Sequence, residues 1–272
     1  MTTLNRVLTT IFDVLTWPLS WMPPLAGLVI LSVLTGILFL LVFPHVSNQG
    51  AIKRTKDAIK ERLLEIRLFK DDLMLVLRAT GRILVSNGLY LWHNLRAMVI
   101  LLVPFCLILF QLNARYAYGP LKVGDRTLLT ARFKPGTPLQ DVRLDLPPGL
   151  VAETPAFHSP TENEVDWRLR AEQPGDYTLT IWAGQDKIEK HLAVDSQPSS
   201  MAPVRTASLL EGLLYCAEPL IPSRSPFEEV KFQYHDRHLG LFKGGELAVA
   251  LIFMLVSLVA GFALKGLFGV QL

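Results

Sequence analysis

Three long apolar segments divide the chain, and each is predicted to cross a membrane. Residues 25–43 and 247–264 contain no charged side chain, and a helix of about 18–20 apolar residues crosses a hydrocarbon core of roughly 30 Å. Residues 97–112 are slightly fewer, but apolar residues and Arg96 precede them, and the long arginine side chain can extend toward the headgroups. The pattern therefore predicts transmembrane helices at residues 25–44, 92–113 and 245–265.

The first 24 residues have an amphipathic pattern instead. Apolar side chains recur at helical spacing from Leu4 to Leu15, and the sequence WPLSWMPP follows them. A helix of this kind lies in the membrane interface, where Trp17 and Trp21 would reach the headgroups. We expect an interfacial amphipathic helix within residues 1–24, with an untethered tail as the alternative.

The segment between the first two spans is charged but also follows a helical pattern. Within residues 46–88, Ile52, Ile59 and Ile66 fall on one apolar stripe. Asp71 or the acidic residue after it can cap a second helix, and Gly81 followed by the Ser-Asn-Gly sequence at residues 86–88 is expected to end that helix. The pattern predicts a basic helical hairpin of coiled-coil type, and a simple helical stalk between the spans is the alternative.

The distribution of charge predicts the orientation of the chain. Residues 46–96 contain ten lysines and arginines against five acidic residues, whereas residues 113–246 contain fifteen against eighteen. Basic loops stay in the cytoplasm, so the N-terminus is expected outside and the C-terminus inside, in a multi-pass protein of the cell inner membrane. Basic side chains of the hairpin are attracted to anionic headgroups. The candidate contacts with lipid or with a client are Lys53, Arg54, Lys56, Lys60, Arg62 and Arg67.

Beyond the second span the pattern changes to short alternating runs separated by turn residues. Apolar side chains take every second position in these runs, which is typical of strands with one buried face. Five such strands without a helical pattern predict an extracytoplasmic, all-β, immunoglobulin-like sandwich over residues 119–197. Residues 198–243 read as a linker with a short surface helix and one more strand around Val230 and Phe232. The runs are TLLTARF, DVRLDL, EVDWRLRA, YTLTIWA and KIEKHLAV.

Composition supports a membrane protein and offers little catalytic chemistry. Half of the residues are hydrophobic and the mean hydropathy is +0.34, and a core of this size cannot easily bury three uncharged helices. The two cysteines fall in different regions, so no disulfide is predicted. His235 and His238 are more typical of surface residues than of a metal site. We expect no catalytic site, cofactor, metal or nucleic-acid partner.

A few polar residues within the spans are candidates for a functional groove: Ser32, Thr35, Gln111 and Ser257. The alternative is that the hydroxyl groups bond to their own helix backbone and that small residues mark helix packing. Pro104 falls within the second span and is expected to kink that helix.

The second and third spans also resemble a known family. The sequence NLRAMVILLVPFCLILFQL, with a basic residue, a methionine and a mid-helix proline, resembles the second span of the YidC/Oxa insertase superfamily. The sequence LIFMLVSLVAGFALKGLFG is similar to its third span. The likeness is to the three-span archaeal and endoplasmic-reticulum branch. The chain differs in having no arginine in the first span and in carrying a β domain between the other two.

This resemblance implies a non-enzymatic, insertase-like or chaperone-like protein that assists the insertion or assembly of other membrane proteins. Its partners would be the bilayer and nascent or partner membrane proteins. The family's groove is semi-polar, and it lowers the cost of moving polar client segments through hydrocarbon. The alternative is a structural or accessory subunit of a larger membrane complex, whose external β domain binds a protein or envelope partner.

Overall fold

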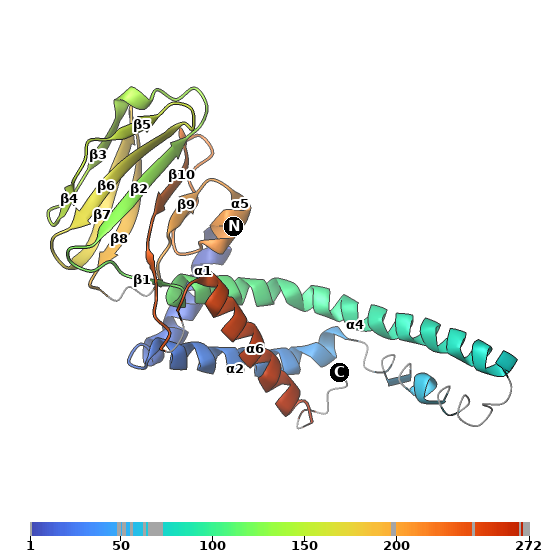
Figure 1. Cartoon of the computed structure of the whole chain (residues 1–272). Coiled ribbons are helices and arrows are strands. Elements are labelled where there is room, and N and C mark those ends of the chain that lie inside the picture. Colours follow the sequence, from blue (N-terminus) through green and yellow to red (C-terminus); the bar gives the residue numbers. More distant parts are fainter. Residues whose placement is uncertain are drawn as a thin grey trace. The chain divides into compact units, whose positions relative to one another are not determined.

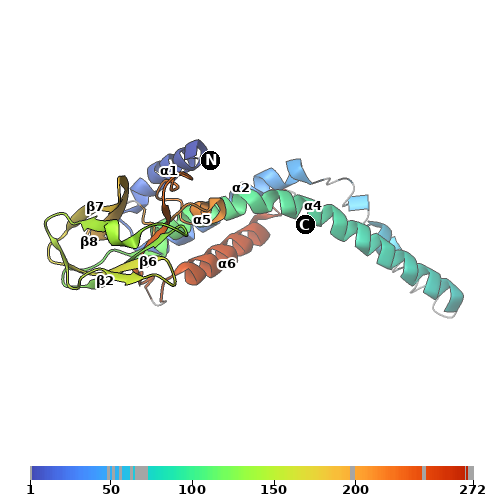
Figure 2. The same cartoon turned by 90° about the horizontal axis from the view of Figure 1, so that it is seen from above.

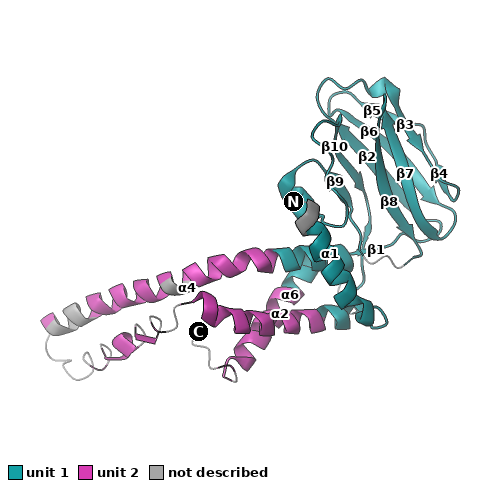
Figure 3. Cartoon of the chain, turned by 180° about the vertical axis from the view of Figure 1, so that it is seen from behind, with its two compact units in different colours: residues 1–28, 107–251 teal, residues 29–106, 252–272 magenta. Residues whose placement is uncertain are grey.

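The computed structural model describes residues 2–47, 50, 53–54, 57–61, 64, 73–196, 200–240, 243–266 and 268. The chain divides into two compact units (Figures 1 and 3). Unit 1 comprises residues 1–28 and 107–251, and unit 2 comprises residues 29–106 and 252–272. All strands that the structure describes belong to unit 1, and most of the described apolar helical residues belong to unit 2.

Among the residues that the structure describes, three helices are long and apolar enough to cross a membrane. They agree closely with the expected spans at the first and third positions, because each is a nearly uninterrupted run of strong apolar helix formers. The helices are α1 (Thr2–Thr16), the 3-10 turn η1 (Trp17–Leu19), α2 (Pro24–Val46), α4 (Leu73–Tyr116), α5 (Leu209–Leu214) and α6 (Glu246–Leu264).

The helix α4 differs from the expected pattern because it is one continuous helix of 44 residues. Gly81 and the Ser-Asn-Gly sequence ending at Gly88 were expected to terminate a separate helix. Each glycine costs a helix only about 1 kcal/mol relative to alanine, and leucine-rich sequence flanks both positions. The second half of the expected hairpin is therefore the N-terminal extension of the second span, and most of its first half falls outside the described residues.

The strands of unit 1 form two main antiparallel sheets. The larger sheet has the order β4-β6-β2-β10-β9, with β5 also paired to β6, and the smaller has the order β3-β7-β8. Figure 2 shows β7 and β8 in a different layer from β2 and β6. The strands are β2 (Arg126–Phe133), β3 (Val142–Asp145), β4 (Leu150–Ala152), β5 (Phe157–Ser159), β6 (Glu164–Ala171), β7 (Gly175–Ala183), β8 (Asp186–Val194), β9 (Val204–Thr206) and β10 (Phe227–Phe232).

One hydrophobic core joins the two sheets. Trp167 on β6 and Phe133 on β2 face the same cluster as Ile181 on β7. The alternation seen in the sequence explains this arrangement, because every second side chain of each strand points into the core.

The β region also extends beyond the boundary expected at residue 197. The strand β10 pairs with β2 through contacts such as Val230 with Ala131, and β9 pairs with the other side of β10. Residues 204–206 and 227–232 are thus part of the larger sheet and not of a linker. Pairing between segments about 100 residues apart leaves no local pattern that would have marked this boundary.

The chain enters and leaves the β region at one place. The short strand β1 (Tyr118–Gly119), directly after α4, pairs with β11 (His235–Asp236), shortly before α6. The Tyr118 hydroxyl donates a hydrogen bond to the Glu246 carboxylate at 2.6 Å. Burial and this carboxylate raise the pKa of Tyr118 above its ordinary value, so the phenol stays protonated and keeps donating.

Tyr177 fixes one corner of the smaller sheet. Its hydroxyl donates a hydrogen bond to the backbone carbonyl of Gln173 at 2.9 Å, and the ring lies against Gly149. Gly149 has a φ of +102°, a conformation that residues with a Cβ rarely adopt, and a Cβ there would also collide with the tyrosine hydroxyl.

Candidate functional site

The most prominent feature of unit 2 is a pocket among its three apolar helices, with a volume of about 390 Å³. We call it the span groove. Each helix contributes four residues at spacings that place them on one helical face. They are Gly36, Phe39, Leu40 and Phe43 of α2, Met98, Leu101, Leu102 and Phe105 of α4, and Ser257, Leu258, Gly261 and Phe262 of α6.

Aromatic rings give the middle of unit 2 a continuous apolar contact. The ring centroids of Phe39 and Phe105 are 6.0 Å apart, and those of Phe105 and Phe253 are 4.7 Å apart. Both pairs are tilted, within the range in which aromatic pairs attract each other. These contacts join α4 to each of the other two helices in unit 2.

Close contact between α2 and α6 depends on Gly36. A Cβ at this position would lie 2.6 Å from the Ser257 carbonyl oxygen and 3.1 Å from the Ala260 Cβ. Small residues at this crossing therefore let the two backbones approach, as they do in membrane helix pairs generally.

Two of the polar side chains that were expected to form a groove donate hydrogen bonds to the backbone of their own helix. The Thr35 hydroxyl donates to the Leu31 carbonyl at 2.8 Å, and the Ser257 hydroxyl donates to the Met254 carbonyl at 3.2 Å. Ser32 is completely buried. Of these three residues, only Ser257 lines the span groove, so the groove is far more apolar than the sequence suggested.

The fourth candidate, Gln111, belongs to unit 1 and takes part in a polar cluster there. Its amide donates to the Thr9 hydroxyl at 3.3 Å, and its oxygen accepts from Arg115 at 2.7 Å. Gln111 is 1% exposed, so it contributes to the packing of α1 on the end of α4.

Pro104 lies inside α4, and the helix continues on both sides of it. Proline has no backbone N–H, so the carbonyl of Ile100, four residues earlier, lacks its usual helical donor. The kink expected at Pro104 stays a prediction.

The N-terminal half of α4 presents apolar side chains to the surroundings. Between the start of α4 and Arg96, seven of the large hydrophobic side chains that the structure describes are exposed, and they face several directions around the helix. Of the basic candidates, Lys53, Arg54 and Lys60 are exposed, and Lys60 pairs with Asp57 at 3.6 Å. Lys56, Arg62 and Arg67 lie outside the described residues. The exposed hydrophobic residues are Met74, Leu84, Val85, Leu89, Leu91, Trp92 and Leu95.

In unit 1, Arg115 attaches α1 to the end of α4. The guanidinium donates to the Asp13 carboxylate at 2.6 Å and to the Thr9 carbonyl at 3.1 Å. The Phe12 ring lies under the same group, with its centroid 5.6 Å away. Arg115 is 5% exposed, so this ion pair is protected from solvent on the arginine side. The amphipathic pattern predicted the helix but gave no indication of this partner.

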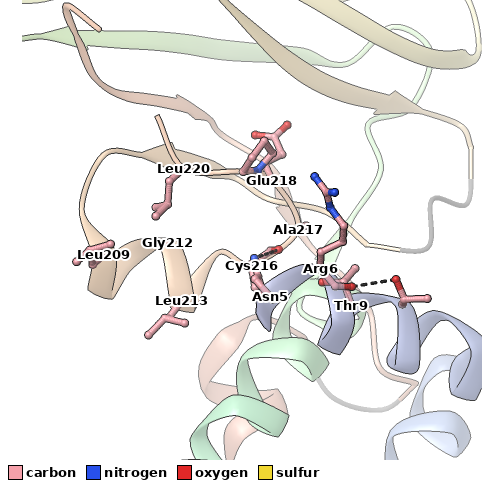
Figure 4. Close-up of a pocket in the computed structure, with 12 residues that line it drawn as sticks. Asn5, Arg6, Thr9, Leu209, Gly212, Leu213, Cys216, Ala217, Glu218 and Leu220 are labelled. Atoms are coloured by element: carbon pink, nitrogen blue, oxygen red, sulfur yellow. Dashed lines mark hydrogen bonds between the residues drawn. The ribbon is translucent and has the colours of Figure 1, made fainter. Parts of the chain in front are cut away.

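Figure 4 shows a pocket of unit 1, between α1 and the segment around α5. The Asn5 amide donates to the Cys216 carbonyl at 2.7 Å across it. Burial raises the pKa of the Cys216 thiol to about 11, and Arg115 acts weakly in the opposite direction. The thiol therefore stays protonated near neutral pH and serves as a packing group, since the thiolate is the reactive form.

A buried ion pair joins β8 to the segment before β10. The Lys190 ammonium donates to the Glu218 carboxylate and to the Ala202 carbonyl, both at 2.6 Å. The other Glu218 oxygen accepts the backbone N–H of His191 at 2.9 Å. Lys190 is fully buried, and this burial lowers its pKa while Glu218 opposes the change. Both charged groups therefore have hydrogen-bond partners, and the pair links β8 to the segment before β10.

The two histidines of the HDRH sequence lie close to one end of the β region. His235 is in β11, and its ring nitrogen lies 3.8 Å from an oxygen of Asp125. Across the described residues, no group of three or more histidine, cysteine or acidic side chains is placed to hold a metal ion.

Comparisons with known proteins give no relative. No family model matches the chain, and neither a curated protein nor a solved structure shows significant similarity to it. The geometry and the sequence therefore carry the functional assignment by themselves.

Proposed function

We propose that the chain is an integral membrane protein that assists the insertion or assembly of other membrane proteins, with α4 as its central element. A helix of 44 residues is about 66 Å long, roughly twice the thickness of a hydrocarbon core. One half of it lines the span groove, and the other half is an arm with exposed apolar side chains. This division of a single helix is the observation that carries the proposal.

The orientation follows from the charge of the segments. Positive charge concentrated in residues 46–96 favours a cytoplasmic arm and an extracytoplasmic β region. The arm would meet a client segment on the side where the client is made, and its basic residues would keep it close to anionic headgroups. The cell inner membrane is the corresponding location.

The span groove would then hold an apolar client segment against three helices. Its lining offers aromatic and aliphatic contacts with a single hydroxyl, that of Ser257. An apolar lining favours retention of a client helix by packing over passage of its polar ends, so a chaperone-like role in assembly is the better supported form. The resemblance to the YidC/Oxa superfamily is consistent with this role.

The β region is proposed to be an immunoglobulin-like sandwich. Two antiparallel sheets with one shared core support this assignment. The hydrogen bond from Tyr177 to a carbonyl four residues earlier has the arrangement of the tyrosine corner found in such folds.

Site-specific photo-crosslinking tests the proposed role. A crosslinker at Leu102 in the groove, or at Leu89 in the arm, should capture ribosome-bound nascent membrane proteins. Leu255 provides the matched control, because it is a similarly exposed residue of α6 that does not line the groove. Equal capture from all three positions, or capture from none, would contradict the proposal.

A second function is favoured by the pairing of the polar groups in the spans. Thr35, Ser257 and Gln111 all make hydrogen bonds within the protein, as expected of a packed anchor. A structural or accessory subunit, whose β region binds a partner in a larger complex, fits this observation. Depletion of the protein separates the two: unchanged insertion of short-tailed client proteins would favour the accessory role.

A further inference from the structure

A pocket of about 470 Å³ in unit 1 combines cations with exposed apolar side chains. It lies where α1 passes into η1 and where α4 ends. The charged residues in its lining are Asp13, Arg115 and Arg237. None of the functional roles considered above uses this pocket.

The charges of the pocket do not balance. Arg115 is paired with Asp13, and their nitrogen and oxygen atoms are 2.6 Å apart. Arg237 donates one hydrogen bond to the Arg115 carbonyl at 2.7 Å, and it has no acidic partner within the part of the chain that the structure describes. The pocket therefore carries one uncompensated positive charge, on a guanidinium whose remaining donors are unused.

The uncompensated cation is also partly dehydrated. Arg237 is half-buried, and this burial lowers its pKa from the ordinary value. An arginine nevertheless remains charged under physiological conditions. An anion at this position would offset the loss of hydration and accept hydrogen bonds from the guanidinium, for which phosphate has matching geometry.

The apolar part of the lining distinguishes an amphiphile from a soluble anion. Trp17 and Met22 are 74% and 43% exposed beside the cations, and Leu19 is half-buried there. The pocket also includes Pro24, the first residue of α2, and Tyr116, the last of α4. These are the ends of two spans, the depth at which headgroups and tryptophan side chains meet.

We propose that this pocket binds the phosphate group of an anionic phospholipid, with Arg237 donating to the phosphate oxygens and the apolar side chains covering the start of the acyl chains. The inference goes beyond the proposed function and is tested without any client, so the two can fail separately.

The experiment titrates lipids onto the purified full chain in a neutral detergent and counts bound molecules by native mass spectrometry. The probes are dioleoyl phosphatidylglycerol, dioleoyl phosphatidylcholine and inorganic phosphate. The wild-type chain should prefer phosphatidylglycerol to phosphatidylcholine, since only the former carries a net negative charge. Arg237→Gln should weaken phosphatidylglycerol binding about tenfold, the value of one charge-assisted hydrogen bond.

Arg143→Gln is the matched control, because Arg143 is exposed on β3 and the substitution removes the same charge. It should bind as the wild type does. Asp13→Asn keeps an acceptor for Arg115 but removes the neutralising charge, so it should tighten binding; this variant decides the matter if Arg237→Gln does not fold. Unchanged binding in either pocket variant overturns the proposal. Inorganic phosphate that binds at the same site as strongly as the lipid would overturn the lipid assignment.

Discussion

At the residue scale, two positions show how much the structure depends on single side chains. Gly36 lets α2 and α6 approach each other, and Glu218 neutralises the buried ammonium of Lys190. Neither contact can be replaced by water, because both positions are buried. Each therefore gives a substitution with a large expected effect.

Gly36→Ala should destabilise the protein by about 1–3 kcal/mol, the usual cost of overpacking. The added methyl group would lie 2.6 Å from the Ser257 carbonyl oxygen, so α2 and α6 must separate in unit 2. Thermal unfolding of the purified protein in detergent measures the change. Gly81→Ala is the control: nothing lies within 4 Å of its added group, and alanine favours the helix, so the melting temperature should stay level or rise.

Glu218→Gln should lower the free energy of unfolding by about 3 kcal/mol, because it leaves the Lys190 charge buried without a counter-charge. Glu189→Gln is the comparison. Glu189 lies on β8, the strand that contains Lys190, and its pair with Lys187 is exposed and contributes at most about 1 kcal/mol. Urea unfolding followed by tryptophan fluorescence measures both. Equal effects of the two substitutions would show that the buried pair has no special weight.

At the scale of elements, sequence patterns predicted the helices and strands that depend on neighbouring residues alone. The spans followed from uninterrupted apolar sequence, and the strands β2, β6, β7 and β8 followed from alternation. The sequence did not predict that β9 and β10 belong to the larger sheet, because β10 pairs with β2, which is about 100 residues away, and β9 pairs with β10. The ion pair of Asp13 with Arg115 was missed for the same reason. Lys190 did leave a signal, since it alternates with Ile188 and Leu192 on the inward face of its strand.

The continuity of α4 gives a prediction that does not depend on function. Spin labels at Met74 and Met98, which are both exposed, should be about 36 Å apart at 1.5 Å per residue. Pulsed electron resonance measures this separation. A broad distribution centred at a much shorter distance would show that the helix ends at Gly81 or Gly88, as the glycine pattern alone suggested.

At the scale of the whole molecule, the membrane orientation that we propose puts the two long loops on opposite sides of a bilayer. Residues 46–96 carry the excess of basic residues, and the β region begins directly after the second span. In the orientation that we propose from the positive-inside rule, the arm is cytoplasmic and the β region lies outside. This orientation underlies both proposed functions.

Cysteine labelling in intact cells tests that orientation. In a variant with serine at Cys106 and Cys216, Lys60→Cys should resist a maleimide that cannot cross membranes, whereas Glu162→Cys should react. Both native side chains are exposed, so accessibility in the fold does not explain a difference. Modification of the cysteine at position 60 in intact cells would reverse the proposed orientation.

The place of β10 inside the larger sheet, and not at its edge, has a consequence for folding. β10 lies between β2 and β9 and ends 14 residues before the start of α6. A nascent chain that stops before Phe227 would leave the edge of β2 open, and an open edge invites pairing with other chains. Completion of the larger sheet therefore waits until the chain has been synthesised as far as Phe232. Shortly afterwards, the last apolar helix follows.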